Sequence, residues 1–303
     1  MNTIELKAKA KVNLILNVLG KRDDGYHEVQ MVMQAIDLAD DVKISWERQA
    51  GLTAVRGCAF GGGMDLTLDP GHKKLPSGPK NLAYQAALRM HDAFHPGQRE
   101  TCGIAVVKNI PLAAGLAGGS TDAAAVIWGL ARLWGLAEGE TDEGMDPDVR
   151  AKLFDVALAI GSDVPFCLAA AMGHEAAVAE GRGEKLTYID PLDARIETFT
   201  PKLEVSTAKV YGALKPEDYA KPYDVTGYLS AKTPEEKCAY LGNHLQAPAV
   251  RLFPKIGKEI ERLSQTEGGL ATLQSGSGPT VFTVFRKSCG LSRTRYQKRS
   301  EQA

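Results

Sequence analysis

The chain has 303 residues, of which 44% are apolar, and a formal net charge of −1 at pH 7. A chain of this length can bury two modest cores, so we expect two domains. The interspersed acids and bases exclude a basic stripe for nucleic acid and a polybasic surface for membranes. No apolar run reaches the roughly 18 residues of a membrane span. No small-residue cleavage site follows the N-terminal segment, so we expect a cytoplasmic protein without a signal peptide.

The five cysteines are odd in number and scattered, and none forms a Cys-x-x-Cys pair. This pattern argues against a disulfide framework and against a zinc site. His91 and His95 stand four residues apart on an expected helix, a spacing that can ligate a metal, but the sequence places no third ligand near them. We therefore expect surface histidines and no metal site made of side chains.

The first expected element is a strand over residues 9–20, in which every second residue is apolar: Val12, Leu14, Leu16 and Val18. The complementary face carries Lys11, Asn13 and Asn17. Because Lys11 and Asn13 stand about 6–7 Å apart along that face, they can meet one polar ligand. The alternative is a plain solvent-facing side, which alternation alone favours.

An Asp-Gly turn over residues 21–28 presents Tyr26 and His27 just past this strand. Adjacent rings at a turn can stack on a heterocyclic base or pack against the protein, and the residues alone favour packing. Further strand material is expected over residues 29–35 and 41–46. Residues 56–80, with the Gly61-Gly62-Gly63 run, are rich in glycine and proline and are expected to form a mobile loop or weak hairpin.

Two amphipathic helices are expected in the first half of the chain. Asn81 opens one, whose apolar stripe ends at Phe94. The other runs from Val149 to Ile160 and stops at Gly161. The acidic residues 137–148 show no pattern of partners and are expected to be solvated.

The most informative stretch is residues 111–125, PLAAGLAGGSTDAAA, which follows a strand-like run over 103–108. A helix is indicated after it by one apolar stripe: Ala123, Ile127, Leu130, Ala131 and Trp134. Ser120 or Gly119 stands where an N-cap belongs. Free backbone N–H groups and the helix dipole favour an anion there, and glycine lets the backbone approach a phosphate. The segment is therefore interpreted as a triphosphate cradle, although its glycines can also merely shape a turn. The Walker A and Rossmann glycine patterns are absent.

Asp163 is the only charged residue between Asp155 and His174. An unpaired buried charge is costly, so this carboxylate needs a partner, unless it forms an Asx turn with its own backbone. Hairpins are expected around residues 181–183 and 276–278. Between them we expect a strand over residues 196–201 and helices over 234–241 and 254–265.

In their order along the chain, these motifs resemble those of the GHMP kinase superfamily, which includes galactokinase, homoserine kinase and mevalonate kinase. The string Pro-x-x-x-Gly-Leu-x-Gly-Gly-Ser-Thr is similar to the ATP loop of that superfamily. One branch, the 4-diphosphocytidyl-2-C-methyl-D-erythritol kinases, is resembled through four further motifs: Lys11-x-Asn13, Gly25-Tyr26-His27, Gly161-Ser-Asp163-Val-Pro and Gly276-Ser-Gly278. The resemblance covers residues 9–285.

The resemblance implies an α+β, two-domain GHMP kinase fold. A ribosomal-protein-S5-like N-terminal domain that binds ATP would span residues 1–175, and a ferredoxin-like C-terminal domain would span 176–303. The implied activity is that of a small-molecule kinase that uses ATP and Mg²⁺. It would phosphorylate the 2-hydroxyl of 4-diphosphocytidyl-2-C-methyl-D-erythritol in non-mevalonate isoprenoid biosynthesis. The expected partners are this small molecule alone, without nucleic acid or membrane, and the expected state is a monomer or weak homodimer.

The resemblance also implies roles for single residues. Lys11 and Asp163 would be the catalytic pair. The substrate would be bound by Asn13, Tyr26, His27, Thr207 and Tyr211, with His27 hydrogen-bonded to the cytosine and Tyr26 stacked on it. ATP would be bound by Asn81, Leu82, Pro111, Leu112, Ala113, Ala114, Gly115, Leu116, Ala117, Gly118, Gly119, Ser120, Thr121, Gly276, Ser277 and Gly278. Magnesium would be held largely by phosphates and water, with Ser120 as the candidate protein ligand.

Two features depart from the family pattern. Arg182 stands in a glycine hairpin where relatives have a smaller residue, and the tail after Phe285 is short and basic where relatives continue with a helix and a strand. One rival reading is another GHMP kinase, of the homoserine or mevalonate type, against which the Tyr26-His27 pair argues. The other is a non-catalytic binder that kept the fold, against which the presence of Lys11 and Asp163 argues.

Overall fold

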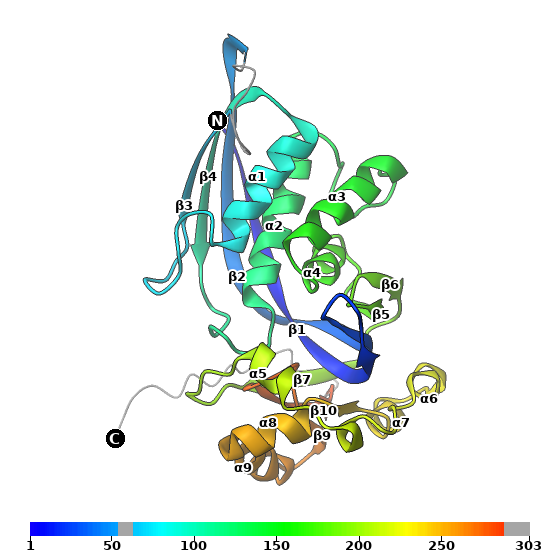
Figure 1. Ribbon diagram of the computed structural model, residues 1–303. Coiled ribbons are helices and arrows are strands. Elements are labelled where there is room, and N and C mark those ends of the chain that lie inside the picture. The colour runs from blue at the N-terminus through cyan, green and yellow to red at the C-terminus, as the bar shows by residue number, and fades with distance from the viewer. Residues whose placement is uncertain (54–62, 288–303) are drawn as a thin grey trace. The chain divides into compact units, whose positions relative to one another are not determined.

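The computed structural model describes residues 1–53 and 63–287, whose helices and strands are labelled in Figure 1. They form two compact units. Unit 1 comprises Met1–Ala10, Ala39–Ile110 and Ala117–Glu175; unit 2 comprises Lys11–Leu38, Pro111–Leu116 and the chain from Ala176 onward. The predicted phosphate loop 111–121 is thus divided between the units after Leu116. The predicted domain boundary near residue 175 stays a prediction.

Two long strands contribute residues to both units: β1 (Asn2–Lys21) and β2 (His27–Thr53). The turn between them is closed by a hydrogen bond from the Arg22 amide to the Tyr26 carbonyl (2.8 Å), with Gly25 at φ 85°. The strand predicted over residues 9–20 is confirmed. The two predicted segments 29–35 and 41–46 are also confirmed as strand, but they belong to one continuous element.

The sheet of unit 1 has the order β3-β4-β2-β1, from β3 (Met64–Asp69), β4 (Gln98–Val107), the later part of β2 and the start of β1. β3 runs parallel to β4, and β2 pairs antiparallel with β4. In this second pairing Asp41 lies opposite Val107 and Arg48 lies opposite Glu100. The expectation of a loop over residues 56–80 is therefore wrong for 64–69, where alternating Leu66 and Leu68 pack against the core. Residues 54–62, with Cys58 and most of the triple-glycine run, lie outside the described part.

Four helices complete the core of unit 1: α1 (Leu82–Phe94), α2 (Gly118–Leu133), α3 (Pro147–Ile160) and α4 (Val164–Ala171). The predicted cap of α1 is confirmed, because Asn81 Oδ1 accepts a hydrogen bond from the Ala83 amide (2.9 Å). α3 ends as predicted, with Gly161 at its C-terminus, but it begins at Pro147, two residues before the predicted Val149. α2 is buried along one continuous stretch from Thr121 to Ala131, so its whole circumference packs into the core.

The predicted start of α2 is wrong. Its N-cap is Ala117, at φ 60°, and no side chain caps the helix. Gly119 and Ser120 lie inside the first turn instead. Because Ala117 adopts the left-handed conformation, the loop turns sharply there, and the helix begins three residues earlier than a Ser120 cap predicts and two earlier than a Gly119 cap predicts.

Two predictions of exposure in unit 1 are also wrong. His91 is fully buried and His95 nearly so; His95 Nδ1 lies 2.7 Å from Glu100 Oε1, and its ring stacks on Trp134 at 4.1 Å. In the acidic loop, Asp142 is not simply solvated, since it binds Arg150 (2.7 Å) and His174 (2.9 Å). Two of these contacts, His95 with Trp134 and Asp142 with His174, join residues distant in sequence, and helical periodicity reveals none of the four. All three tryptophans of the chain, Trp46, Trp128 and Trp134, lie in unit 1.

Unit 2 holds two groups of strands. β5 (Ala176–Gly181) pairs with β2 and with β6 (Lys185–Tyr188), and β8 (Gly242–Asn243) runs parallel to β1. A separate three-stranded sheet has the order β7-β10-β9, from β7 (Ala194–Phe199), β10 (Val281–Arg286) and β9 (Gly269–Gln274). Both predicted hairpins and the strand near residues 196–201 are confirmed.

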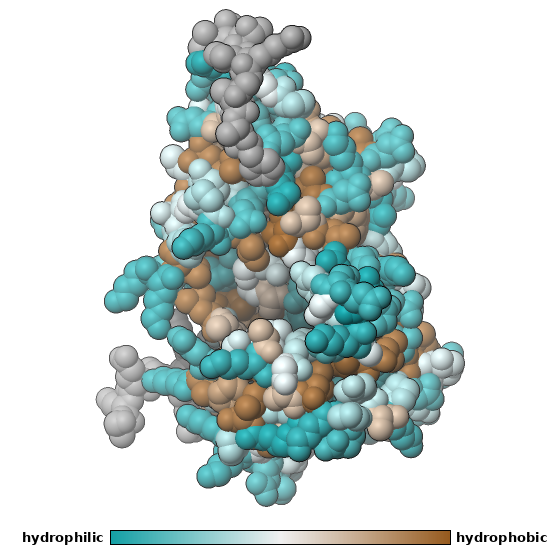
Figure 2. Space-filling view, viewed as in Figure 1, coloured by the Kyte–Doolittle hydropathy of each residue, from teal (hydrophilic) through white to brown (hydrophobic). Residues whose placement is uncertain are grey.

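The helices of unit 2 are short: α5 (Thr207–Gly212), α6 (Val225–Ser230), α7 (Pro234–Cys238), α8 (Gln246–Leu252) and α9 (Pro254–Ser264), with a 3₁₀ turn at Pro216–Asp218. α9 matches its predicted range, whereas α7 ends three residues before the predicted Leu241. The basic tail and Cys289 lie outside the described residues. No helix of the described part is long and apolar enough to cross a membrane, and hydrophilic residues cover much of the face seen in Figure 2.

Candidate active site

The polar face of β1 in unit 2 is buried, contrary to the solvent-facing alternative. Lys11 is 4% exposed and Asn13 is fully buried. Lys11 Nζ donates to Asn13 Oδ1 (2.8 Å), and Asn13 Nδ2 donates to the sulfur of Met31 (3.2 Å). Asn17 has a structural role, because its Nδ2 donates to the Tyr223 carbonyl (2.9 Å) and its Oδ1 accepts from the Tyr223 amide (2.8 Å). The predicted pair Lys11 and Asn13 is thus brought together in a buried, hydrogen-bonded arrangement.

The first part of the predicted phosphate loop, also in unit 2, lies between β1 and the glycine turn 275–280. The Lys11 amide donates to the Leu116 carbonyl (3.2 Å), and the Thr280 amide donates to the Ala114 carbonyl (3.3 Å). Ser275 Oγ donates to the Gly115 carbonyl (3.0 Å). At Gly115, with φ 73°, a Cβ would lie 2.6 Å from the Ser275 carbonyl oxygen, so only glycine fits. Two segments predicted separately from the sequence are therefore in contact.

The turn 275–280 is held by buried amides. Asn243 Nδ2 donates to the carbonyls of Gln274 (2.9 Å) and Gly276 (2.8 Å), and its Oδ1 accepts from the Leu245 amide (2.8 Å). Gln274 Nε2 also donates to the Gly276 carbonyl (3.0 Å). Sequence reasoning missed Asn243, and its sequence neighbours, Gly242 and His244, form no recognisable motif with it. Its contacts join residues 243 and 276, which no local pattern links.

Helix α5 carries two predicted substrate residues on unit 2. Thr207 Oγ1 lies 2.8 Å from Ser277 Oγ of the glycine turn. One helical turn later, the Tyr211 ring lies 4.8 Å from the His27 ring, tilted by 31°. Tyr211, which the family resemblance assigns to the substrate, is therefore next to His27. Burial lowers the pKa of His27, and nearby Lys21 lowers it further, which favours the neutral imidazole near pH 7.

Tyr26 is 51% exposed at the turn before β2. The guanidinium of Arg182, the residue that departs from the family pattern, lies over its ring at 4.8 Å from the centroid. Such a contact at an exposed site contributes about 0.5–1 kcal/mol. One face of the Tyr26 ring is thus covered by the β5–β6 hairpin of the same unit.

In unit 1 the predicted nucleotide residues also converge. Leu82 opens α1, and its Cδ1 lies 3.6 Å from where a Cβ of Gly119 would stand. Thr121 Oγ1 donates to the Lys9 carbonyl (2.7 Å), which fixes the first turn of α2 to β1. The free N–H groups of that turn belong to Gly118, Gly119 and Ser120, because α2 has no side-chain cap.

Three charged side chains of unit 1 lie buried beside this turn, and sequence reasoning missed all of them. Lys108 Nζ donates to Asp40 and to Asp122, the latter at 2.6 Å. Burial raises the pKa of the Asp122 carboxyl, the Asp40 carboxylate adds to the increase, and the Lys108 ammonium opposes it. The available signal was that Asp122 directly follows the loop motif and Lys108 ends the preceding strand.

Asp163 immediately precedes α4 in unit 1 and is partly buried. Its carboxylate makes no capping hydrogen bond to that helix, which argues against the Asx-turn alternative. Lys11 belongs to unit 2, so the pairing of Lys11 with Asp163 stays a prediction. Among residues 1–53 and 63–287, no cluster of three His, Cys, Asp or Glu side chains is arranged to hold a metal.

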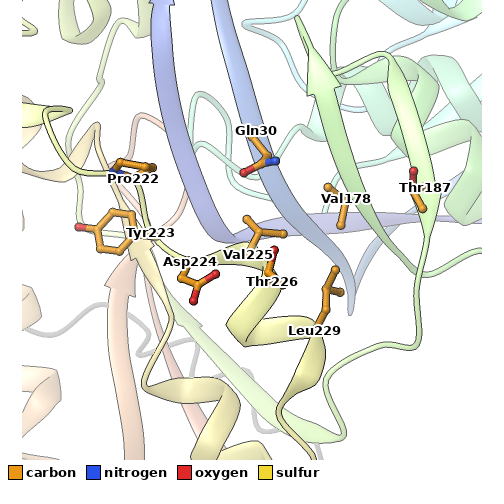
Figure 3. A pocket seen from close by; sticks show the side chains of 9 residues that line it. All are labelled: Gln30, Val178, Thr187, Pro222, Tyr223, Asp224, Val225, Thr226 and Leu229. Carbon is orange, nitrogen blue, oxygen red and sulfur yellow. The ribbon is translucent and has the colours of Figure 1, made fainter.

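A cavity of about 570 Å³ opens in unit 2, and none of the predicted site residues lines it. Figure 3 shows Gln30 of β2, Val178 of β5 and Thr187 of β6 on one side, and the residues that lead into α6 on the other. Gln30 and Met31 are neighbours on a strand and point to opposite faces. Because Met31 contacts Asn13, this cavity lies on the face of β2 opposite to the candidate site.

Comparisons with known proteins agree with this geometry. Residues 81–171 match the family described as GHMP kinases N terminal domain. The chain is 37% identical, over 97% of its length and 94% of the relative's, to the 4-diphosphocytidyl-2-C-methyl-D-erythritol kinase of Pelobacter propionicus. It is 38% identical to the enzyme of that name from Bacillus subtilis, over 95% of this chain and 90% of the relative.

Solved structures extend the comparison. A crystal structure of 4-(cytidine 5'-diphospho)-2C-methyl-D-erythritol kinase aligns with 93% of this chain and 90% of its own, at 31% identity and a TM-score of 0.66. The homoserine kinase of Cytophaga hutchinsonii shares the fold, with a TM-score of 0.66 at 17% identity over 94% of this chain and 85% of its own.

The fold and the glycine-rich loop define the chain as a GHMP kinase, a small-molecule phosphotransferase with the two-domain α+β fold of that superfamily. Membership of a kinase family implies that the chain uses ATP. Within it, the identity over nearly the full length shows that the chain belongs to the 4-diphosphocytidyl-2-C-methyl-D-erythritol kinase family.

Proposed function

We propose that this protein transfers the γ-phosphoryl group of ATP to the 2-hydroxyl of 4-diphosphocytidyl-2-C-methyl-D-erythritol. The observation that carries the proposal is the buried Lys11–Asn13 pair, in contact with the loop at Leu116. A buried ammonium beside backbone that is predicted to bind phosphate supplies the positive charge that phosphoryl transfer requires. The names of the relatives supply the acceptor that fits a phosphoryl-transfer site of this kind.

Lys11 and Asp163 act in this proposal as the catalytic pair. Phosphoryl transfer requires mainly positioning and neutralisation of charge, because the transition state spreads charge over the moving group. The Lys11 ammonium supplies positive charge, and the Asp163 carboxylate orients the acceptor hydroxyl and takes its proton. Asn13, whose Oδ1 holds the ammonium in place, binds the substrate near the transferred group.

The nucleotide phosphates bind to the backbone N–H groups of residues 113–121 and of the turn 276–278. The uncapped first turn of α2 supplies free donors and the positive end of the helix dipole. Mg²⁺ bound to the phosphates would neutralise part of their charge, and the Ser120 hydroxyl is the protein group we assign to it. Asn81 and Leu82 hold the adenine end.

The cytosine binds beside His27, Tyr26 and Tyr211. The His27–Tyr211 ring contact at 4.8 Å leaves no space for a base between these two rings, so the base lies against an outer face or the rings part to admit it. A neutral His27 imidazole both donates and accepts, which matches the mixed hydrogen-bonding edge of cytosine.

The reaction is tested by ADP release with Mg-ATP and each of three acceptors: 4-diphosphocytidyl-2-C-methyl-D-erythritol, homoserine and mevalonate. Turnover with the cytidyl acceptor alone is expected. Asp163→Asn should then lower kcat by about 10²–10⁴-fold, the usual contribution of a general base. Asp155→Asn, an exposed carboxylate on α3, is the matched control and should leave kcat unchanged. Equal rates for Asp163→Asn and wild type would refute the role of Asp163, and turnover with homoserine or mevalonate would refute the acceptor.

A further inference from the structure

Three buried charges lie where the chain enters and leaves the predicted phosphate loop. The side chains of Asp40, Lys108 and Asp122 are 0, 5 and 9% exposed. Lys108 Nζ donates to both carboxylates. All three belong to unit 1. We call them the Lys108 triad.

The triad fastens both ends of the segment. At the entrance, Asp40 Oδ1 accepts hydrogen bonds from the backbone amides of Asn109 (2.5 Å) and Ile110 (2.8 Å), the last residues before Pro111. At the exit, Asp122 follows Thr121 directly in α2 and is bound to the same ammonium. One lysine thus ties together two points of the chain that are separated by the whole predicted loop.

The triad also lies against the start of α2. A Cβ at Gly118 would stand 3.1 Å from Ile110 Cγ2 and 3.5 Å from Lys108 Nζ, so the first residue of the helix packs on the ammonium and on the anchored Ile110. No side chain caps α2. The position of its free N–H groups therefore depends on the contacts behind the first turn, namely those of the triad and the bond from Thr121 to the Lys9 carbonyl.

The composition of the triad is expensive for a purely structural contact. Burying an ion pair costs desolvation energy that apolar residues of similar volume avoid. Within the described residues, Asp122 Oδ1 is buried and has no hydrogen-bond partner, while Oδ2 is bound to Lys108. The hydrogen bonds of the triad are directional, and they fix three backbone segments at one point: β2 at Asp40, residues 108–110, and α2 at Asp122.

We propose that Asp40, Lys108 and Asp122 are positioning residues that hold the first turn of α2 in the conformation that binds nucleotide phosphates. The inference rests on the proposed function, in which residues 111–121 bind ATP. It adds a set of residues that do not touch the nucleotide and act through the backbone of the loop. Donors that are already in place bind a phosphate without the cost of ordering them, so loosening the triad weakens nucleotide binding specifically.

The test is the affinity of the full chain for ADP and for CDP, measured by isothermal titration calorimetry without an acceptor. Asp122→Ala removes the exit anchor, and we expect the Kd for ADP to rise about tenfold, within the range that small displacements of binding groups produce. The Kd for CDP should stay within about twofold, since its predicted site is in unit 2. Asp122→Asn keeps an oxygen that accepts from Lys108, so it should restore most of the ADP affinity.

Asp142→Asn is the matched control. It weakens another partly buried ion pair of unit 1, with Arg150 and His174, that touches neither end of the loop. Its ADP affinity should equal that of wild type even where its stability falls. Asp122→Glu keeps every charge and moves the carboxylate by one methylene group; it should raise the Kd for ADP by at least about threefold, and it replaces Asp122→Ala if that variant does not fold.

Two results would overturn the inference. The first is an unchanged Kd for ADP in both Asp122→Ala and Asp122→Glu. The second is an equal loss of ADP and CDP affinity in these variants, which would indicate general loosening of the protein. If the wild type itself binds CDP but no ADP, the assignment of the loop to ATP fails first, and the inference falls with it.

Discussion

In unit 1 the start of α2 is held by three charged side chains, whereas in unit 2 the glycine turn 275–280 is held by the neutral amides of Asn243 and Gln274. Both devices act on backbone that we assign to the nucleotide phosphates. In the Lys108 triad one ammonium serves two carboxylates. Beside the turn, the side-chain amide of Asn243 makes three hydrogen bonds to backbone groups, those of Gln274, Gly276 and Leu245.

Because of this difference, the two supports should respond differently to mutation and to pH. This ionic cluster depends most on its one ammonium, because removing Lys108 leaves both carboxylates buried without a cation, and it depends on pH through its carboxylates. An amide has no charge to compensate and does not titrate, so its removal costs only the desolvation of the groups it leaves unpaired. The two supports should therefore differ in the size of the damage and in its dependence on pH.

Lys108→Met should cause the largest loss, because it leaves Asp40 and Asp122 buried together without a cation. The free energy of unfolding, from urea unfolding followed by circular dichroism, should fall by about 3–5 kcal/mol. Lys43→Met is the control, since its bond to Glu5 (2.9 Å) joins two exposed side chains and should be worth less than about 1 kcal/mol. Similar losses for the two variants would remove the distinction between a buried and an exposed cation.

Asn243→Ala should have an intermediate effect. It takes a donor from the carbonyls of Gln274 and Gly276, and the free energy of unfolding should fall by about 1–3 kcal/mol. Gln85→Ala, which removes an exposed amide bonded to the Pro79 carbonyl (2.8 Å), should cost less than about 0.5 kcal/mol by the same measurement. A loss as large as that of Lys108→Met would contradict the proposed contrast between amides and ions.

The pH dependence should be the smallest and most selective effect. Burial raises the pKa of the Asp122 carboxyl from 3.8 to about 7, so between these values the folded state holds a proton that the unfolded state has lost. The stabilisation from this group is complete below pH 3.8 and is lost as the pH rises through about 7. From pH 5.5 to 7.5 the unfolding midpoint of the wild type should fall relative to that of Asp122→Asn by about 2–4 °C.

Asn243→Ala sharpens this last measurement. Because an amide does not titrate, the unfolding midpoint of Asn243→Ala should change with pH in parallel with that of the wild type over the same range. Parallel curves for the wild type and Asp122→Asn would show that Asp122 does not titrate there and would leave the two supports alike in their response to pH.

Local chemistry made much of the fold predictable. Asn81 caps α1 by accepting a hydrogen bond from the amide of Ala83, two residues away, and the glycine hairpins at 181–183 and 276–278 are set by neighbours in sequence. The family resemblance supplied the candidate site, and the structure brings its unit 2 members together, from Lys11 and Asn13 to Ser277. Each of these predictions rested on a short motif.

The remainder depends on contacts between distant residues. Lys108 is hydrogen-bonded to Asp40, which is 68 residues away in sequence, and Asn243 is hydrogen-bonded to Gly276, which is 33 residues away. The burial of His95 follows from Glu100 and Trp134, which a helical pattern does not place beside it. The start of α2 was misplaced because a Ser cap is the usual local solution, whereas here Ala117 turns the chain at φ 60° without one.

The location of all three tryptophans in unit 1 gives the molecule a built-in optical reporter. Trp128 is fully buried on α2, and Trp46 and Trp134 lie 6.4 Å apart beside the His95 ring. Intrinsic indole fluorescence therefore reports on unit 1 alone, whereas far-ultraviolet ellipticity reports on both units. Recording the two signals in one titration would separate the melting of unit 1, which carries the Lys108 triad, from that of unit 2 without any label.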